Sequence, residues 1–88
     1  MHNNIYKIFL SEDLKKEQEI LLQKDKEKIK KIISKLSENP RPFKCKKLKG
    51  DDQEYRIRYR NRRILYTIDD KNKKVIVHGI PQRKEAYK

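Results

Sequence analysis

Arginine alternates with apolar residues over one short stretch, and this pattern could do chemistry on a phosphate. Between Tyr55 and Arg60 the sequence reads YRIRYR. Successive side chains of an extended strand point to opposite faces, so one face would be apolar and the other cationic. Guanidinium groups stay protonated at physiological pH and match phosphate oxygens in bidentate fashion. The stretch therefore predicts a half-buried strand whose exposed face suits a polyanion.

A second strand is predicted from Ile64 to Asp69, after a tight connection around residues 60–62. If the two strands pair as a hairpin, one surface carries three arginines: Arg56, Arg58 and Arg63. The opposite surface of the hairpin would then be apolar, with Ile64, Tyr66 and Ile68 of the second strand beside the apolar residues of the first. Tyr59 and Tyr66 fall on that apolar side, so we interpret them as core residues and not as platforms for base stacking.

Positive charge is concentrated around this predicted hairpin. The chain has 88 residues and a formal net charge of +12. Residues 41–63 contain ten Lys plus Arg against three Asp plus Glu, whereas residues 11–38 contain eight basic and seven acidic residues. An isolated exposed arginine is usually only a solvated side chain. The clustering favours a binding face for nucleic acid, an anionic membrane or an acidic protein.

Other kinds of site have little support in the composition. The one cysteine, Cys45, excludes an internal disulfide, and with only His2 and His78 beside it a structural zinc site is not expected. We expect no cofactor. No apolar run approaches the ~20 residues of a membrane span, and the N-terminus lacks a signal-peptide pattern. The expected location is the cytoplasm, with no membrane partner.

Hydrophobic periodicity predicts one α+β domain over residues 1–88. A strand at Ile5–Leu10 leads through a cap signal at Ser11 into a helix over about residues 12–23. Asp25 is expected to cap a second helix. That helix is the most strongly marked element, because apolar residues recur at i, i+3, i+4 and i+7: Ile29, Ile32, Ile33 and Leu36.

Prolines end the second helix at residues 39–42, and Phe43 and Leu48 are expected to hold the following loop on the core. A turn at residues 50–52 precedes the arginine strand, and a last strand is predicted over residues 74–80, followed by a short turn or helix. The predicted order is strand, helix, helix, strand, strand, strand. This gives a mostly antiparallel sheet with a helical hairpin on one face and arginines on the other.

Taken in order, the motifs resemble the RelE/ParE superfamily of toxins from bacterial and archaeal toxin–antitoxin pairs. The resemblance covers nearly the whole chain. It rests on ENP at residues 38–40, CKKLKG at 45–50, YRIRYRNRRILYTID at 55–69 and VIVHGIPQRKEAYK at 75–88. It implies a RelE-like fold. It also implies a cognate antitoxin, which we expect to be an acidic, partly disordered chain that folds across this basic domain.

Members similar to RelE cleave messenger RNA on the ribosome without a metal, using the substrate's own 2′-hydroxyl as nucleophile and leaving a cyclic phosphate. The resemblance therefore implies mRNA and the ribosome as further partners. It places the catalytic roles on five residues: Arg56, Arg58, Arg63, Arg83 and Tyr87. The neighbouring cations are expected to bind substrate: Lys46, Lys47, Lys49 and Arg60.

The general base is left open by one departure from the family pattern. RelE-like enzymes carry lysines where this chain has Arg56 and Arg58, and an arginine cannot act as a base at ordinary pH. A histidine that many relatives carry before the C-terminal arginine is replaced by Gln82. Four candidates for the base remain: Tyr87, Glu85, Glu54 and His78.

Two other functions also remain open at the level of sequence. A ParE-like chain would bind DNA gyrase and have no nuclease activity. A plain RNA-binding module would hold phosphates without cutting them, and its affinity would fall steeply with salt.

Overall fold

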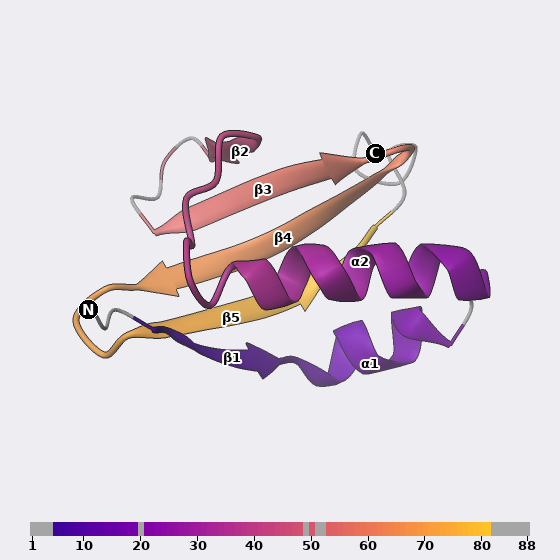
Figure 1. The fold of residues 1–88 in the computed structure, drawn as a ribbon, viewed down its shortest axis with the longest axis horizontal. Helices are drawn as coiled ribbons and strands as arrows, with labels where there is room; N and C mark the ends of the chain where they lie inside the picture. Colours follow the sequence, from indigo (N-terminus) through magenta and orange to yellow (C-terminus); the bar gives the residue numbers. More distant parts are fainter. Residues whose placement is uncertain (1–4, 20, 49, 51–52, 82–88) are drawn as a thin grey trace.

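The computed structural model describes residues 5–19, 21–48, 50 and 53–81. Within these residues the elements follow the order strand, helix, helix and four strands (Figure 1). Their bounds are β1 Lys7–Leu10, α1 Glu12–Gln18, α2 Gln23–Lys35, β2 Cys45–Lys47, β3 Glu54–Tyr59, β4 Arg62–Asp69 and β5 Lys74–Gly79. In this part of the chain no helix has the length and apolar character needed to cross a membrane.

The strands form one sheet in the order β1-β5-β4-β3-β2. β1 runs parallel to β5, and the other neighbouring pairs are antiparallel. In Figure 1 α1 and α2 lie on the same side of this sheet. The expected α+β architecture is therefore confirmed.

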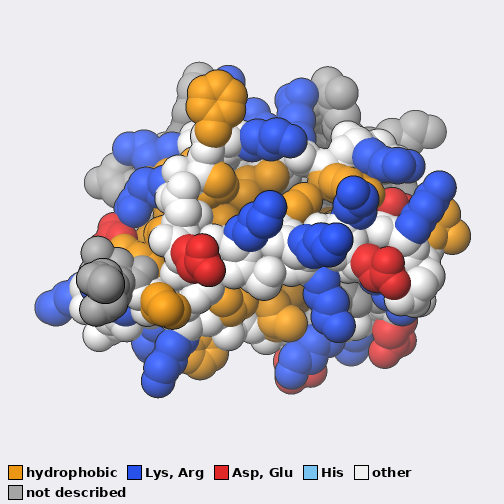
Figure 2. Space-filling view, viewed as in Figure 1, with side chains coloured by type: hydrophobic (Ala, Val, Ile, Leu, Met, Phe, Trp, Pro, Cys, Tyr) orange, Lys and Arg blue, Asp and Glu red, His pale blue; other side chains and the backbone are white. Residues whose placement is uncertain are grey.

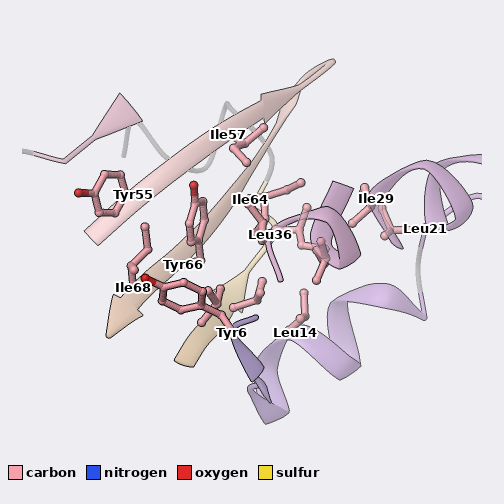
Figure 3. Packing of buried hydrophobic residues seen from close by; sticks show 14 residues of the cluster. Tyr6, Leu14, Leu21, Ile29, Leu36, Tyr55, Ile57, Ile64, Tyr66 and Ile68 are labelled. Carbon is pink, nitrogen blue, oxygen red and sulfur yellow. The ribbon is translucent and has the colours of Figure 1, made fainter. Parts of the chain in front are cut away.

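The core fills the space between the helices and the sheet (Figure 3). The period-2 residues of β3 and β4, except Tyr59, are buried as predicted, and they share one cluster with Leu14 of α1 and the apolar stripe of α2. Tyr66 is fully buried, its hydroxyl donates to the Pro40 carbonyl at 2.8 Å, and burial raises its pKa. Tyr59 is partly buried against the same cluster. The interpretation of both tyrosines as packing residues is confirmed.

Ser11 joins the start of α1 to β5. Its Oγ accepts a hydrogen bond from the Leu14 amide at 3.2 Å, as an N-cap does, and donates to the His78 carbonyl at 2.6 Å. The predicted cap is confirmed. It also fixes the position at which the chain leaves β1.

The helix boundaries differ from the prediction. α1 ends at Gln18, before residue 23, and α2 begins at Gln23 with Leu22 at the N-cap position. The link between them turns Leu21 into the core and leaves Leu22 65% exposed. Asp25 does not cap α2, because it lies inside the first turn, where its carboxylate accepts the Tyr59 hydroxyl at 3.0 Å.

The loop after α2 also departs from the prediction. Phe43 does not pack on the core but is fully exposed, whereas Leu48 is half-buried. Between Phe43 and Leu48 lies β2, a strand that sequence analysis did not predict. It pairs antiparallel with residues 55–57 of β3. Its residues are Cys45, Lys46 and Lys47, so a short, charged edge strand carries no apolar signal.

Arg41, in the loop after α2, forms a polar cluster with Asp70 and Tyr55 at the edge of the core. Its Nη1 and Nη2 donate to both carboxylate oxygens of Asp70 at 3.1 and 2.7 Å, and its Nε donates to the Tyr55 hydroxyl at 3.1 Å. The Tyr6 hydroxyl also donates to Asp70, at 2.6 Å. The bonds from Arg41 and Tyr6 lower the pKa of Asp70 from 3.8 to about 2.

Asp70→Asn tests the contribution of this cluster to stability. Because the folded protein keeps the carboxylate ionised to lower pH than the unfolded chain, the bond stabilises the fold above pH 3.8 and is lost as pH falls through about 2. The Asp70 side chain is 53% exposed, and solvent screening reduces the effect to roughly 1 kcal/mol. Urea unfolding should show the variant less stable at neutral pH, with most of the difference lost near pH 2. An equal difference at both pH values would contradict this role.

Leu36→Ala and Leu22→Ala form a matched pair for the core. Leu36 is fully buried, so its truncation should lower the free energy of unfolding by about 2–5 kcal/mol. Leu22 is largely exposed, and its truncation should cost less than about 0.5 kcal/mol. Urea denaturation midpoints measure both. Similar losses in the two variants would mean that Leu22 is packed in the core and would contradict its exposure.

Candidate functional site

The pairing of β3 with β4 gathers the predicted arginines on the sheet face opposite the helices. The register places Arg58 directly across from Arg63, and Arg56 between Lys46 of β2 and Leu65 of β4. Arg58 is exposed, whereas Arg56 and Arg63 are half-buried. The expectation that these three arginines share one surface is confirmed. We call this surface, with Lys46, the arginine face.

A hollow of about 230 Å³ lies at one side of the arginine face, and its lining is entirely cationic: Lys44, Lys46, Arg56 and Arg58. Four cations around one hollow attract an anion and repel one another, so an anionic ligand would relieve that repulsion. Sequence analysis overlooked Lys44. The alternation of Lys44, Cys45 and Lys46 repeats the period-2 pattern of the arginine strand and could have identified it.

Other predicted cations lie away from this hollow. Arg60 occupies the two-residue connection between β3 and β4 with a φ of 57°, and its guanidinium lies over the Tyr59 ring at 5.7 Å. Lys47 pairs with Tyr55, so alternation along β2 places it on the side opposite Lys46. Arg62 donates to the Ile80 carbonyl at 2.8 Å and is a structural residue.

The C-terminal candidates Arg83, Tyr87 and Glu85 lie outside the described residues, as does Lys49. The last described residue, Pro81, lies next to β4 at the arginine face, because its carbonyl accepts a hydrogen bond from the backbone amide of Arg63 at 3.1 Å.

A hydrogen-bonded chain of three side chains crosses the sheet beside the arginines. Oγ1 of Thr67 donates to Oε2 of Glu54 at 2.5 Å, and Oγ1 of Thr67 also lies 2.5 Å from Nε2 of His78. Nε2 of His78 is 3.9 Å from Oε1 of Glu54. Two of the four candidates for the general base are thus joined by Thr67, a residue that sequence analysis did not select.

The described residues contain no cluster of three or more His, Cys, Asp and Glu side chains that could hold a metal ion. The side chains of this face can stabilise negative charge through guanidinium and ammonium groups and can transfer a proton through Glu54, Thr67 and His78.

Comparison with known sequences identifies the family. The profile of the family described as "ParE toxin of type II toxin-antitoxin system, parDE" matches residues 10–87. The chain is also 38% identical over 64 residues to the Methanocaldococcus jannaschii protein named "Putative toxin RelE1", and the match covers 69% of this chain and 71% of that protein.

Solved structures share the fold. The RelE–RelB complex of Pyrococcus horikoshii gives a TM-score of 0.81 at 21% identity, with 90% of this chain and 96% of that chain covered. The isolated Escherichia coli RelE toxin gives 0.77 at 29% identity, with 93% and 90% covered. The family profile spans most of the sequence, and the fold agrees. The chain is therefore a RelE-like toxin of the RelE/ParE superfamily, from a type II toxin–antitoxin system.

Proposed function

We propose that this toxin is an endoribonuclease that cleaves messenger RNA on the ribosome, in the cytoplasm and without a metal. The observation that carries the proposal is the convergence of Arg56, Arg58 and Arg63 on one open sheet face. The likeness to the RelE toxin of E. coli supports it. A sheet face of this kind suits an extended RNA strand, whose phosphates follow one another along the cations.

In the proposed reaction the 2′-hydroxyl of one nucleotide attacks the adjacent phosphorus. The O2′–P bond forms and the P–O5′ bond breaks, so the products are a 2′,3′-cyclic phosphate and a 5′-hydroxyl. Negative charge builds on the pentavalent phosphorus, and arginine donors stabilise it by roughly 3–4 kcal/mol for one well-placed group. Directly opposed residues on antiparallel strands have Cβ atoms about 4.5–5.5 Å apart. Arg58 and Arg63 are therefore placed to hold two oxygens of one phosphate.

The remaining cations take supporting roles in this proposal. The cationic hollow with Lys44 and Lys46 binds a neighbouring phosphate and sets the register of the strand. By the family pattern, Arg83 contacts the reacting phosphate, and Tyr87 stacks on a base or takes part in proton transfer.

A ParE-like gyrase inhibitor is the second candidate, and the description of the matching family favours it. The two functions differ in what they damage. A gyrase inhibitor would break DNA and leave messages intact, whereas an endoribonuclease would generate new 5′ ends within coding sequences. A plain RNA-binding module would produce neither.

Sequencing the 5′ ends of cellular RNA after brief expression separates these functions. We expect new 5′-hydroxyl ends in translated messages. Arg63→Ala should lower the cleavage rate in a translating extract by about 100-fold or more, as expected for the loss of one transition-state donor. Lys28→Ala removes the same charge from exposed α2 and should cleave like wild type. Intact messages with broken DNA would overturn the proposal, and equal cleavage by Arg63→Ala would overturn the site.

We further propose that the cognate antitoxin covers an apolar groove beside α2 that borders the arginine face at Lys44 and Arg58. The groove encloses about 340 Å³ and is lined by Ile32, Lys35, Pro42, Phe43, Lys44, Ile57, Arg58 and Tyr59. Figure 2 shows apolar side chains between α2 and the segment that leads to β2, with Lys and Arg around them. Apolar walls rimmed by cations suit a segment that is both apolar and acidic. The solved RelE–RelB complexes of relatives support an antitoxin partner.

Phe43→Ser tests this docking site. The Phe43 ring is fully exposed in the isolated chain, so its removal should leave the fold stable. If the antitoxin buries the ring, the loss of about 1.5–3 kcal/mol weakens binding roughly 10- to 150-fold. Phe9→Ser removes another exposed ring, one that does not line the groove, and serves as the control. Titration with the antitoxin by calorimetry measures both, and equal affinities for the two variants would place the antitoxin elsewhere.

A further inference from the structure

The four residues that define the arginine face are all cations, although the reaction proposed above requires a group that accepts a proton. A guanidinium stays protonated, so Arg56, Arg58 and Arg63 can stabilise charge but cannot deprotonate a 2′-hydroxyl. The hydrogen-bonded chain of Glu54, Thr67 and His78 lies on the same face. Glu54 precedes Arg56 by two residues on β3, and Thr67 follows Leu65, the partner of Arg56, by two residues on β4.

Strand register explains why these three side chains meet. Glu54 and Thr67 are direct partners between β3 and β4. Between β4 and β5 the register shifts: Leu65 pairs with Gly79 and Tyr66 pairs with Val77, so His78 is the additional residue of a bulge. Bulges redirect side chains and recur beside active sites. Here the bulge lies at His78, whose imidazole contacts Thr67 on the neighbouring strand β4. Glu54 lies one strand further, on β3.

We infer that His78 is the general base of the proposed RNA cleavage and that Thr67 and Glu54 position it. With Glu54 ionised, the Thr67 hydroxyl donates to the carboxylate, and its oxygen accepts Nε2–H of His78. This hydrogen bonding leaves Nδ1 as the acceptor nitrogen. The His78 side chain is 45% exposed, so substrate can reach the ring.

The proton balance of the step is simple. Nδ1 of His78 takes the proton of the 2′-hydroxyl while the O2′–P bond forms. The P–O5′ bond breaks, and the departing O5′ takes a proton from solvent water. The imidazolium that results is stabilised by Glu54 through the Thr67 hydroxyl, and it returns its proton to solvent after the products leave.

The surroundings of His78 contain charges of both signs. Register and alternation place the following groups on its face: Lys46 from β2, Glu54, Arg56 and Arg58 from β3, Arg63 and Asp69 from β4, Lys74 from β5 and Lys7 from β1. From the helix side, Ser11 bonds the His78 carbonyl, and Oε1 of Glu17 accepts the Ile80 amide at 2.7 Å. Glu54 is the anion joined to the ring, through the hydroxyl of Thr67.

Single-turnover cleavage on programmed ribosomes tests this inference, which rests on the proposed function. His78→Ala should lower the cleavage rate by about 100-fold or more. His78→Asn can still bond Thr67 but cannot accept a proton, so it should lose the same activity. The wild-type rate should rise with pH, because only the neutral imidazole accepts a proton, and this rise should be absent in both variants. Added imidazole should restore part of the activity of His78→Ala only.

Thr67→Val supplies a control for structure. It removes the hydroxyl at nearly constant shape, and we expect a smaller loss of rate with His78 still responsible for the pH dependence. Urea unfolding and ribosome binding should be close to wild type in all variants. A merely structural role predicts lost stability with an unchanged pH profile and no imidazole rescue, and that result overturns the inference. Cleavage by wild type and His78→Ala at equal rates overturns it while leaving the proposed function intact. Absence of cleavage by wild type overturns both.

Discussion

The register of the β3–β4 pair is the constraint on which the rest of the molecule depends. Side chains alternate on each strand, so a slip of one residue would carry the arginines into the core and the buried tyrosines and isoleucines into water. Burial against α1 and α2 fixes the register. The same burial therefore sets the positions of Arg56, Arg58 and Arg63. The apolar core and the arginine face are two results of one alignment.

This alignment has an electrostatic cost. Arg58 lies directly across from Arg63, and like charges at directly opposed positions destabilise a strand pair by roughly 0.2–1 kcal/mol. Lys46 opposite Arg56 adds a second such pair. The core residues of the same strands offset these repulsions, since Ile57, Ile64 and Tyr66 are almost fully buried. The arrangement is one that an anionic ligand stabilises, because binding removes the repulsion.

The net charge of the chain overstates how many cations the arginine face can offer to a ligand. Arg41 is committed to Asp70, and Arg62 is committed to the Ile80 carbonyl. Lys73 and Lys74 lie over the rings of Tyr6 and Phe9. Many of the remaining lysines belong to the helices on the other side of the sheet. The function of a basic protein of this kind depends on where strand pairing places its cations.

The fold was predictable from sequence where apolar periodicity was strong. The alternation in β3 and β4 and the stripe of α2 each record one buried face, so strands, helix and core followed from them. Features without an apolar signal were missed or misplaced: the charged edge strand β2, the exposed Phe43 and the start of α2 at Gln23. The contact of Thr67 with His78 depends on a register shift between strands, and no local pattern encodes that shift.

The parallel pairing of β1 with β5 joins the two ends of the described fold. β5 lies between β1 and β4 in the sheet, so β1 has no neighbour until the last strand has been synthesised. Closing so long a loop is entropically costly and slow compared with forming the β3–β4 hairpin. A nascent chain can thus form its arginine hairpin early, but it completes the sheet that supports it only near the end of translation. Assembly of the toxin is in this way coupled to the synthesis of β5.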